Sequence, residues 1–359
     1  MKKILLMLLA GVSVLSVAGQ ARWSAEKANN WYKQQDWSRG CNYQPSTVIN
    51  QLEMFQAATF DPATINRELG WAQNLGFNTM RVFLHHIAWS SDKDGFKKRL
   101  NQYLGISDKH GIKTILVFFD DCWNDEYHAG KQPEPKTGIH NSGWVRDPGT
   151  VIRTNPDSLK MLESYVKDIM TMLKDDKRVL LWDLYNEPGN NQYFDKSLPL
   201  LKSVFGWARE VGPSQPVSAG VWNWGEKFAE LNKFELENSD VITYHNYAYI
   251  DAHIKRIEEL QQYGRPLICT EYMARKNASL FQTIMPVLKK NKIGAINWGF
   301  VSGKTNTIYA WGVPMPDGKE PELWFHDILR KDGTPFSEDE VNTIKSLTKK
   351  SKLHSDHQK

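Results

Sequence analysis

The chain has 359 residues, and its 45 basic and 41 acidic side chains leave a formal net charge of +4. This near balance argues against a nucleic-acid-binding protein, because such proteins usually carry a clustered basic face. The length exceeds that of a typical domain, yet α/β barrels routinely pass about 250 residues as one domain. Since no Ser/Gly/Pro-rich linker interrupts the sequence, we expect one catalytic domain.

Residues 1–21 have the pattern of a secretory signal peptide. Lys2 and Lys3 precede an apolar stretch over residues 4–17, and small residues follow it. The stretch is shorter than the roughly 20 residues that span a membrane. We therefore expect export to the periplasm or to the outside of the cell, with no stable membrane insertion after cleavage. A retained N-terminal anchor is the alternative.

Three cysteines, Cys41, Cys122 and Cys269, make an odd number for an exported protein. Cys41 and Cys269 fall inside apolar, strand-like runs. A chain of this length can bury its own core without a disulfide framework. We interpret all three as buried thiols, with a bridge between Cys41 and Cys269 as the alternative.

Eight short runs of apolar and β-branched residues recur along the chain, at residues 41–43, 79–84, 114–119, 179–185, 216–219, 241–244, 267–270 and 295–298. Segments with helical spacing lie between most of these runs. Alternation of strand and helix predicts a parallel sheet. Eight such units predict an α/β fold, a single (β/α)8 TIM barrel over residues 22–348.

Helix boundaries are marked by proline and glycine. Asp61-Pro62 and Asn155-Pro156 are typical helix starts, because the acidic or amide side chain caps the first turn and proline fits its first position. Glycine follows several predicted helix ends, where it relieves a left-handed cap. The last predicted helix runs from Ser337 to about Leu347, and residues 349–359 read as a disordered tail.

Two connections are longer than the rest. Residues 122–155, after the third strand, and residues 299–321, after the eighth, are rich in aromatic residues and proline. Long loops are either functional or disordered, and the aromatic content argues against disorder. We expect these loops to form the walls of a cleft.

Two glutamates follow apolar runs 84 residues apart, Glu187 in WDLYNEPGN and Glu271 in PLICTEYMAR. Catalytic groups of a barrel lie at the carboxyl ends of its strands. Hydrolysis of a sugar acetal passes through an oxocarbenium-like state, which needs one carboxylic acid to protonate the leaving oxygen and one carboxylate to stabilise or attack the anomeric carbon. We predict Glu187 as acid/base and Glu271 as the partner carboxylate. The alternatives are a helix-capping carboxylate and a salt-bridged rim glutamate.

Further polar and aromatic residues occupy the same strand ends. Asn186 can offer its amide to the 2-hydroxyl of the reacting sugar, and Tyr272 beside Glu271 can orient that carboxylate. Arg81 interrupts an apolar strand and needs a carboxylate partner, for which Glu271 is the candidate and another rim acid the alternative. His245 and Tyr247 lie at the end of the sixth strand and are further candidates for the site. Trp298, Trp222 and Trp224 are candidates for stacking on a sugar ring.

Five features occur together at the predicted strands: arginine on the second, Asn-Glu-Pro on the fourth, His-x-Tyr on the sixth, glutamate on the seventh and tryptophan on the eighth. This combination resembles the clan A retaining glycoside hydrolases, nearest to family 5. The resemblance covers essentially the whole predicted barrel. It implies that Glu187 is the acid/base and Glu271 the nucleophile, in a double displacement that retains anomeric configuration. Supporting and sugar-binding roles are implied for Arg81, Tyr247, Asn186, His245 and Trp298. It implies a carbohydrate substrate and no cofactor.

One departure from the family pattern concerns the third strand. Many family 5 enzymes end this strand in histidine, whereas here the sequence reads Phe118-Phe119-Asp120-Asp121-Cys122. Asp120 is then expected to face the subsite for the glycone, which bears on the identity of the sugar more than on the mechanism.

Three other functions are compatible with parts of the same sequence. A metal-dependent barrel hydrolase would draw on histidines and acids at the rim, yet His85 and His86 would point to opposite faces if the strand still runs there. A non-catalytic carbohydrate-binding barrel has no need of both glutamates, and a transglycosidase would use the same residues. We expect endo-acting cleavage of a β-linked polysaccharide of plant type, with exo-acting cleavage as the alternative.

Overall fold

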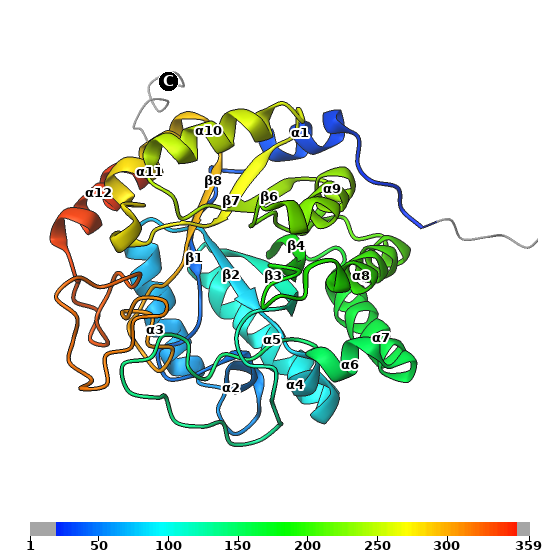
Figure 1. Ribbon diagram of the computed structural model, residues 1–359, viewed down its shortest axis with the longest axis horizontal. Coiled ribbons are helices and arrows are strands. Elements are labelled where there is room, and N and C mark those ends of the chain that lie inside the picture. The colour runs from blue at the N-terminus through cyan, green and yellow to red at the C-terminus, as the bar shows by residue number, and fades with distance from the viewer. Residues whose placement is uncertain (1–18, 350–359) are drawn as a thin grey trace, which may run out of the picture.

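The computed structural model describes residues 19–349, and Figure 1 shows a central barrel of strands with helices around it. Most of the predicted signal peptide and of the predicted tail lies outside the described residues. The strands are β1 Arg39–Asn42, β2 Thr79–Phe83, β3 Lys113–Asp120, β4 Val179–Asn186, β5 Val217–Ser218, β6 Ile242–His245, β7 Leu267–Glu271 and β8 Gly294–Asn297. Each overlaps one predicted run.

The eight strands form one parallel sheet in the order β5-β4-β3-β2-β1-β8-β7-β6. Its two edge strands meet through a parallel bridge between Val221 and Tyr244. The hydroxyl of Ser218 also donates a hydrogen bond of 2.7 Å to the carbonyl of Val241. These contacts close the sheet, so the predicted TIM barrel is confirmed.

Twelve α-helices and three short 3₁₀ helices are present among the described residues. They are α1 Ala25–Lys33, α2 Gln51–Phe55, α3 Pro62–Asn74, α4 His86–Ser91, α5 Lys93–Lys109, α6 Thr150–Thr154, α7 Pro156–Leu173, η1 Phe194–Ser197, α8 Leu198–Val211, η2 Glu226–Phe228, α9 Ala229–Asn238, α10 Ile250–Gln261, η3 Arg275–Asn277, α11 Phe281–Lys290 and α12 Glu338–Thr348. Within the described residues, no helix is long and apolar enough to span a membrane.

Capping hydrogen bonds and a glycine occur at the predicted helix boundaries. Asp61 accepts a hydrogen bond of 3.0 Å from the backbone N–H of Thr64, and Asn155 accepts one of 2.9 Å from that of Asp157. Gly76, which follows the end of α3, has a φ of 77°, a conformation that glycine adopts without steric cost.

The barrel interior changes from apolar to polar along the strands. Ile115, Leu181 and Ile268 belong to one fully buried apolar cluster. Asp183 lies two residues beyond Leu181 and is also fully buried, so it shares the inward face of β4. The carboxyl ends of the strands therefore enclose a polar layer, and the functional groups described next lie at this end.

The three cysteines are free and buried, as predicted. Cys41 lies against Met80, with 3.3 Å between the two sulfur atoms. The alternative of a bridge between Cys41 and Cys269 is therefore wrong.

Candidate active site

A cavity of about 370 Å³ opens at the carboxyl ends of the strands and contains both glutamates. Its walls come from the ends of β3, β4 and β7, from the segment after β6, and from both long loops. The lining residues are Asp120, Cys122, Trp123, His140, Asn141, Trp144, Asn186, Glu187, Asn190, Asn191, Trp222, Tyr247, Glu271, Trp298 and Trp311.

Glu187 directly follows β4 and has a φ of 44°, in the left-handed region that non-glycine residues rarely adopt. Such backbone strain clusters at functional sites. Its Oε2 accepts hydrogen bonds from the amide of Asn190 at 2.6 Å and the thiol of Cys122 at 3.2 Å. Burial raises the pKa of Glu187, and these two donors oppose the rise. The site thus favours a carboxyl group that holds its proton longer than an exposed one.

Glu271 is the last residue of β7. Its Oε1 lies 2.9 Å from Nη1 of Arg81, and its Oε2 accepts a hydrogen bond of 2.7 Å from the hydroxyl of Tyr247. Burial raises the pKa of Glu271, while the positive charge of Arg81 and the Tyr247 hydroxyl lower it. Two donors therefore hold both oxygens of this carboxylate. Tyr272, the predicted neighbour, is instead buried against Phe281.

His245 lies between the two glutamates. Its Nδ1 is 2.8 Å from Oε1 of Glu187 and 3.5 Å from Oε2 of Glu271. One carboxylate oxygen of Glu187, one of Glu271 and one ring nitrogen of His245 all lie within 4.8 Å of one another. Burial lowers the pKa of His245 to about 4, so its imidazole is neutral near pH 7. Through Nδ1, a neutral ring can donate to an ionised Glu187 or accept from a protonated one without adding a charge to the site.

Arg81 is fully buried and joins the two halves of the site. The predicted pairing with Glu271 is present. Nε also donates a hydrogen bond of 2.8 Å to Oδ2 of Asp183, an acid inside β4 rather than at the rim. The guanidinium also donates to the side-chain oxygens of Asn42 at 2.8 Å and Asn186 at 2.7 Å. Sequence reasoning missed Asp183, whose only signal was a single acid inside an apolar strand.

Asp120 lines the cavity, yet its oxygens are already engaged. Oδ1 accepts from the amide of Asn186 and from the backbone N–H of Cys122, each at 2.9 Å, and Oδ2 accepts from the indole of Trp144 at 2.7 Å. Burial raises the pKa of Asp120 to about 7 against these donors. Its contacts orient Asn186 and Trp144.

The predicted tryptophans separate into two groups. Trp298 and Trp222 line the cavity, and Trp298 packs against Trp144 with 5.6 Å between ring centroids. The structure does not bring Trp224 to this cavity, which corrects its prediction. Its ring lies under the guanidinium of Arg256, 3.7 Å from the ring centroid, beside a separate surface hollow. Trp222 and Trp224 follow the same strand, so chain position alone could not distinguish them.

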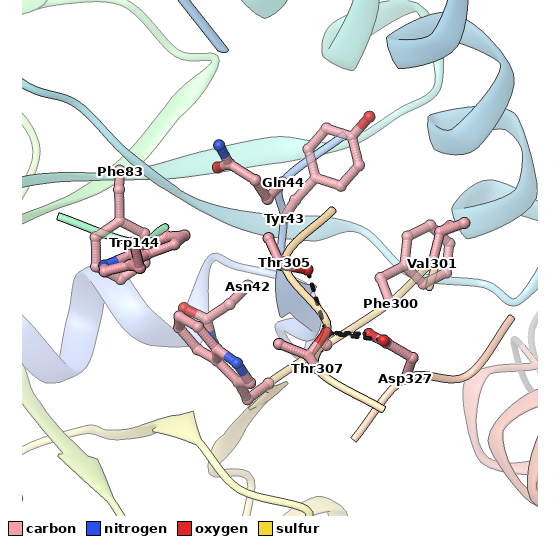
Figure 2. A pocket seen from close by; sticks show the side chains of 12 residues that line it. Asn42, Tyr43, Gln44, Phe83, Trp144, Phe300, Val301, Thr305, Thr307 and Asp327 are labelled. Atoms are coloured by element: carbon pink, nitrogen blue, oxygen red, sulfur yellow. Dashed lines mark hydrogen bonds between the residues drawn. The ribbon is translucent and has the colours of Figure 1, made fainter. Parts of the chain in front are cut away.

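A second, much smaller cavity of about 20 Å³ shares Trp144 and Trp298 with the main one. Figure 2 shows Thr305, Thr307 and Asp327 on one side of it and Phe83 with Trp144 on another. The hydroxyl of Thr307 lies 2.8 Å from both oxygens of Asp327. This space is large enough for about one water molecule.

The two long loops contact each other as well as the cavity. The backbone N–H of Asn141 donates to the carbonyl of Thr305 at 2.8 Å, and that of Met315 donates to Gly138 at 3.0 Å. Trp311 packs against Tyr247 with 4.8 Å between centroids. The predicted cleft walls are thus present and are joined on the side of Tyr247.

Other lining residues carried little sequence signal for a role. Cys122 was predicted only as a buried thiol, and Asn190 was not singled out, although both contact Glu187. The aromatic content of the two long loops predicted cleft walls but no separate role for Trp123, His140, Trp144 or Trp311. Which of them faces the cavity depends on irregular loop backbone, for which no sequence periodicity exists.

His85, His86 and Asp147 form a second group whose ligand atoms are close enough for a metal ion. Strand β2 ends at Phe83, so the two histidines do not point to opposite faces, and their rings stack 5.0 Å apart. Nε2 of His85 contacts the carbonyl of Arg146 at 2.9 Å, and Nδ1 of His86 contacts Asp147. A metal ion would have to displace these hydrogen bonds.

The sequence model for cellulase, glycosyl hydrolase family 5, matches residues 42–303, well over half of the chain. Mannan endo-1,4-beta-mannosidase 1 from Solanum lycopersicum is 29% identical over a 117-residue alignment that covers 29% of this chain and 26% of that protein. The matched stretch therefore spans about a quarter of that relative's length.

Solved structures share the fold at low identity. A GH5_18 variant from Streptomyces cattleya in complex with Manb1-4GlcNAc is 14% identical with a TM-score of 0.60, over 86% of this chain and 79% of that chain. The exo-beta-1,4-mannosidase Op5Man5 from Opitutaceae bacterium strain TAV5 is 17% identical with a TM-score of 0.61, over 87% of this chain and 59% of that chain. With the family model spanning the barrel, the chain belongs to glycosyl hydrolase family 5.

Proposed function

We propose that the protein hydrolyses β-mannosidic bonds of a β-linked polysaccharide or oligosaccharide with retention of anomeric configuration. The choice of mannose rests on the names of similar proteins, an endo-acting mannan hydrolase among the relatives and an exo-acting mannosidase among the structures. The choice of mechanism rests on the contacts of Glu187 and Glu271.

The spacing of the two carboxyl groups is the observation that carries this proposal. Retaining glycosidases have carboxyl groups about 5 to 5.5 Å apart, whereas inverting enzymes need about 6.5 to 9.5 Å for an intervening water. Here one oxygen of Glu187 and one of Glu271 lie within 4.8 Å of each other, and a ring nitrogen of His245 lies within 4.8 Å of both. This close approach favours direct attack by a carboxylate.

In the first step, Glu271 attacks the anomeric carbon while Glu187 gives its proton to the leaving oxygen. In the second, Glu187 takes a proton from the water that releases the sugar from Glu271. Arg81 and Tyr247 orient Glu271 and lower its pKa against the effect of burial, whereas burial raises the pKa of Glu187 and favours its protonated form. The faces of Trp298 and Trp222 offer stacking surfaces for sugar rings in the cavity.

The sequence favours cleavage within the sugar chain, the endo-acting mode. The joined loops favour a second candidate, cleavage at the chain end, which is the exo-acting mode. Glu187 must face the leaving group, so the glycone lies toward Glu271 and Tyr247. The loop wall with Trp311 stands against Tyr247 on that side. Hydrogen bonds between the loops there restrict how far a sugar chain can extend past the bond to be cleaved.

The test is hydrolysis of aryl β-glycosides and of β-1,4-linked manno-oligosaccharides by the wild-type protein, Glu187→Gln and Glu271→Gln. Product anomers are followed by NMR. We expect the β-anomer first from the wild-type protein and no activity on the oligosaccharides from either variant. Near-normal turnover in either variant, or the α-anomer first, would overturn the assignment.

Three further readouts separate the remaining functions. Oligosaccharides labelled at the reducing end distinguish stepwise release of single sugars, the exo-acting result, from mid-chain products. Products longer than the substrate would indicate transglycosylation. Binding of the same sugars without turnover at any substrate would instead indicate a carbohydrate-binding barrel.

A further inference from the structure

The thiol of Cys122 contacts the carboxyl group that we assign as acid/base. Cys122 lies two residues beyond β3, lines the cavity and is 8% exposed. Its Sγ is 3.2 Å from Oε2 of Glu187. Cys41 and Cys269 are fully buried and do not line the cavity, so Cys122 is the cysteine at this site.

Neighbouring amides determine the direction of the hydrogen bond. Nδ2 of Asn190 is 3.3 Å from the sulfur, and Nδ2 of Asn186 is 3.4 Å from it. Both amide nitrogens can only donate, so the sulfur accepts from them, and its own proton is free to point to Glu187. Burial raises the pKa of the Cys122 thiol well above its usual value, and the carboxylates of Asp120 and Glu187 raise it further. The thiol therefore keeps its proton.

The two oxygens of Glu187 consequently have different surroundings. Oε2 accepts from Cys122 and from the amide of Asn190 at 2.6 Å. Oε1 faces His245 at 2.8 Å. Because Oε2 already accepts two hydrogen bonds, a proton on the carboxyl group resides on Oε1.

We propose that Cys122 is a positioning residue for Glu187, whose S–H, together with the amide of Asn190, holds Oε2 so that Oε1 exchanges the catalytic proton. This inference rests on the proposed role of Glu187. Loss of the thiol should free the carboxyl group to rotate and should remove a donor that favours its ionised form. Only the step that needs the acid should suffer.

The test compares Cys122→Ala, Cys122→Ser and Asn190→Ala on two aryl β-glycosides of the sugar that the enzyme accepts. A phenyl leaving group needs protonation, whereas a 2,4-dinitrophenyl group departs without it. We expect Cys122→Ala and Asn190→Ala to lose about three- to tenfold in kcat/KM on the phenyl glycoside and to keep wild-type values on the dinitrophenyl one. Cys122→Ser should keep most of the activity on both, because serine still donates.

The pH profile gives a second readout. Removal of the thiol raises the pKa of Glu187, so the alkaline limb of kcat/KM should move to higher pH in Cys122→Ala and stay near its wild-type position in Cys122→Ser. Cys41→Ala is the matched control, because it removes a buried thiol that contacts Met80 rather than a carboxyl group. It should leave the leaving-group dependence and the pH limb unchanged.

Three results would overturn the inference: wild-type kcat/KM on both glycosides in Cys122→Ala, equal losses on both, or equal losses in Cys122→Ser and Cys122→Ala. Glu187→Ala is measured alongside. If it shows the selective loss on the phenyl glycoside while Cys122→Ala does not, the proposed function stands and the inference about Cys122 fails. If Glu187→Ala shows no selective loss, the acid role of Glu187 fails as well.

Discussion

Arg81 and Asp183 form an ion pair inside the barrel, with 2.8 Å between Nη2 and Oδ2 and neither side chain exposed to solvent. Burial raises the pKa of Asp183, and the charge of Arg81 opposes this rise. Desolvation of two charges is costly, so such a pair need not stabilise the fold by itself. Its geometric effect is to fix the guanidinium whose Nη1 lies 2.9 Å from Glu271.

Removal of one partner from this pair should be strongly destabilising. Asp183→Ala leaves Arg81 buried with Glu271 as its remaining anionic partner. We expect a loss of about 3 to 5 kcal/mol in the free energy of unfolding, measured by urea denaturation. Asp317→Ala is the control, because its ion pair with Lys319 is exposed and should leave the unfolding midpoint nearly unchanged. A loss below about 1 kcal/mol in Asp183→Ala would show that Glu271 alone satisfies Arg81.

Strands and helices could be predicted because their apolar residues recur with a regular sequence period, whereas contacts between residues distant in the chain have no such period. Each strand has an apolar run, and each parallel connection needs a helix, so all eight strands could be located before the structure. Glu187, Glu271 and Arg81 stood out because a charge at the end of or inside such a run is unusual. Asp183 is equally unusual, but its partner could not be identified without the barrel register.

Loop residues gave no comparable signal. Trp222 and Trp224 differ by two positions in an irregular segment, and only the first lines the cavity. Cys122 follows two aspartates at the start of the long loop after β3, and its contact with Glu187 depends on the turn of the backbone there. Loop backbone has no fixed period, so the direction of these side chains follows only from tertiary contacts.

Separate chemical rescue of the two glutamates should distinguish their roles. In Glu271→Ala, azide can occupy the space of the lost nucleophile and attack the anomeric carbon directly. We expect turnover of a dinitrophenyl glycoside to return with azide and to give the α-glycosyl azide. In Glu187→Ala, the intermediate still forms on Glu271 with a good leaving group, so azide should give the β-glycosyl azide. The configuration of each azide product, measured by NMR, checks the assignment, and the reverse pattern would exchange the two roles.

Tyr247→Phe should move the acid limb of the pH profile. The Tyr247 hydroxyl donates 2.7 Å to Oε2 of Glu271 and lowers the pKa of that carboxyl group. Without the hydroxyl, the pKa of Glu271 rises, and a higher pH is needed to ionise the nucleophile. We expect the acid limb of kcat/KM to shift upward and the maximum to fall by about tenfold or more. The exposed Tyr249 provides the control Tyr249→Phe, which should match the wild type. An unchanged acid limb in Tyr247→Phe would mean that this limb reports the ionisation of a group other than Glu271.

Gly138→Val should separate the two loops that wall the cavity. Gly138 has a φ of 67°, and an added Cβ would lie 1.8 Å from the carbonyl oxygen of Met315, so the loops must move apart. We expect kcat/KM on short substrates to fall, because these depend most on a closed wall beside Tyr247. Product analysis on labelled manno-oligosaccharides should also show more mid-chain cleavage if the joined loops restrict the wild-type enzyme to chain ends.

The control for this substitution lies in the same loop. Gly130 has a φ of 92°, but an added Cβ would meet nothing within 4 Å. Gly130→Val therefore carries the same kind of backbone strain without separating the loops. If Gly130→Val and Gly138→Val change the products equally, the effect comes from strain in the loop. If only Gly138→Val changes them, the contact between Gly138 and Met315 controls which bond of the substrate reaches Glu187 and Glu271.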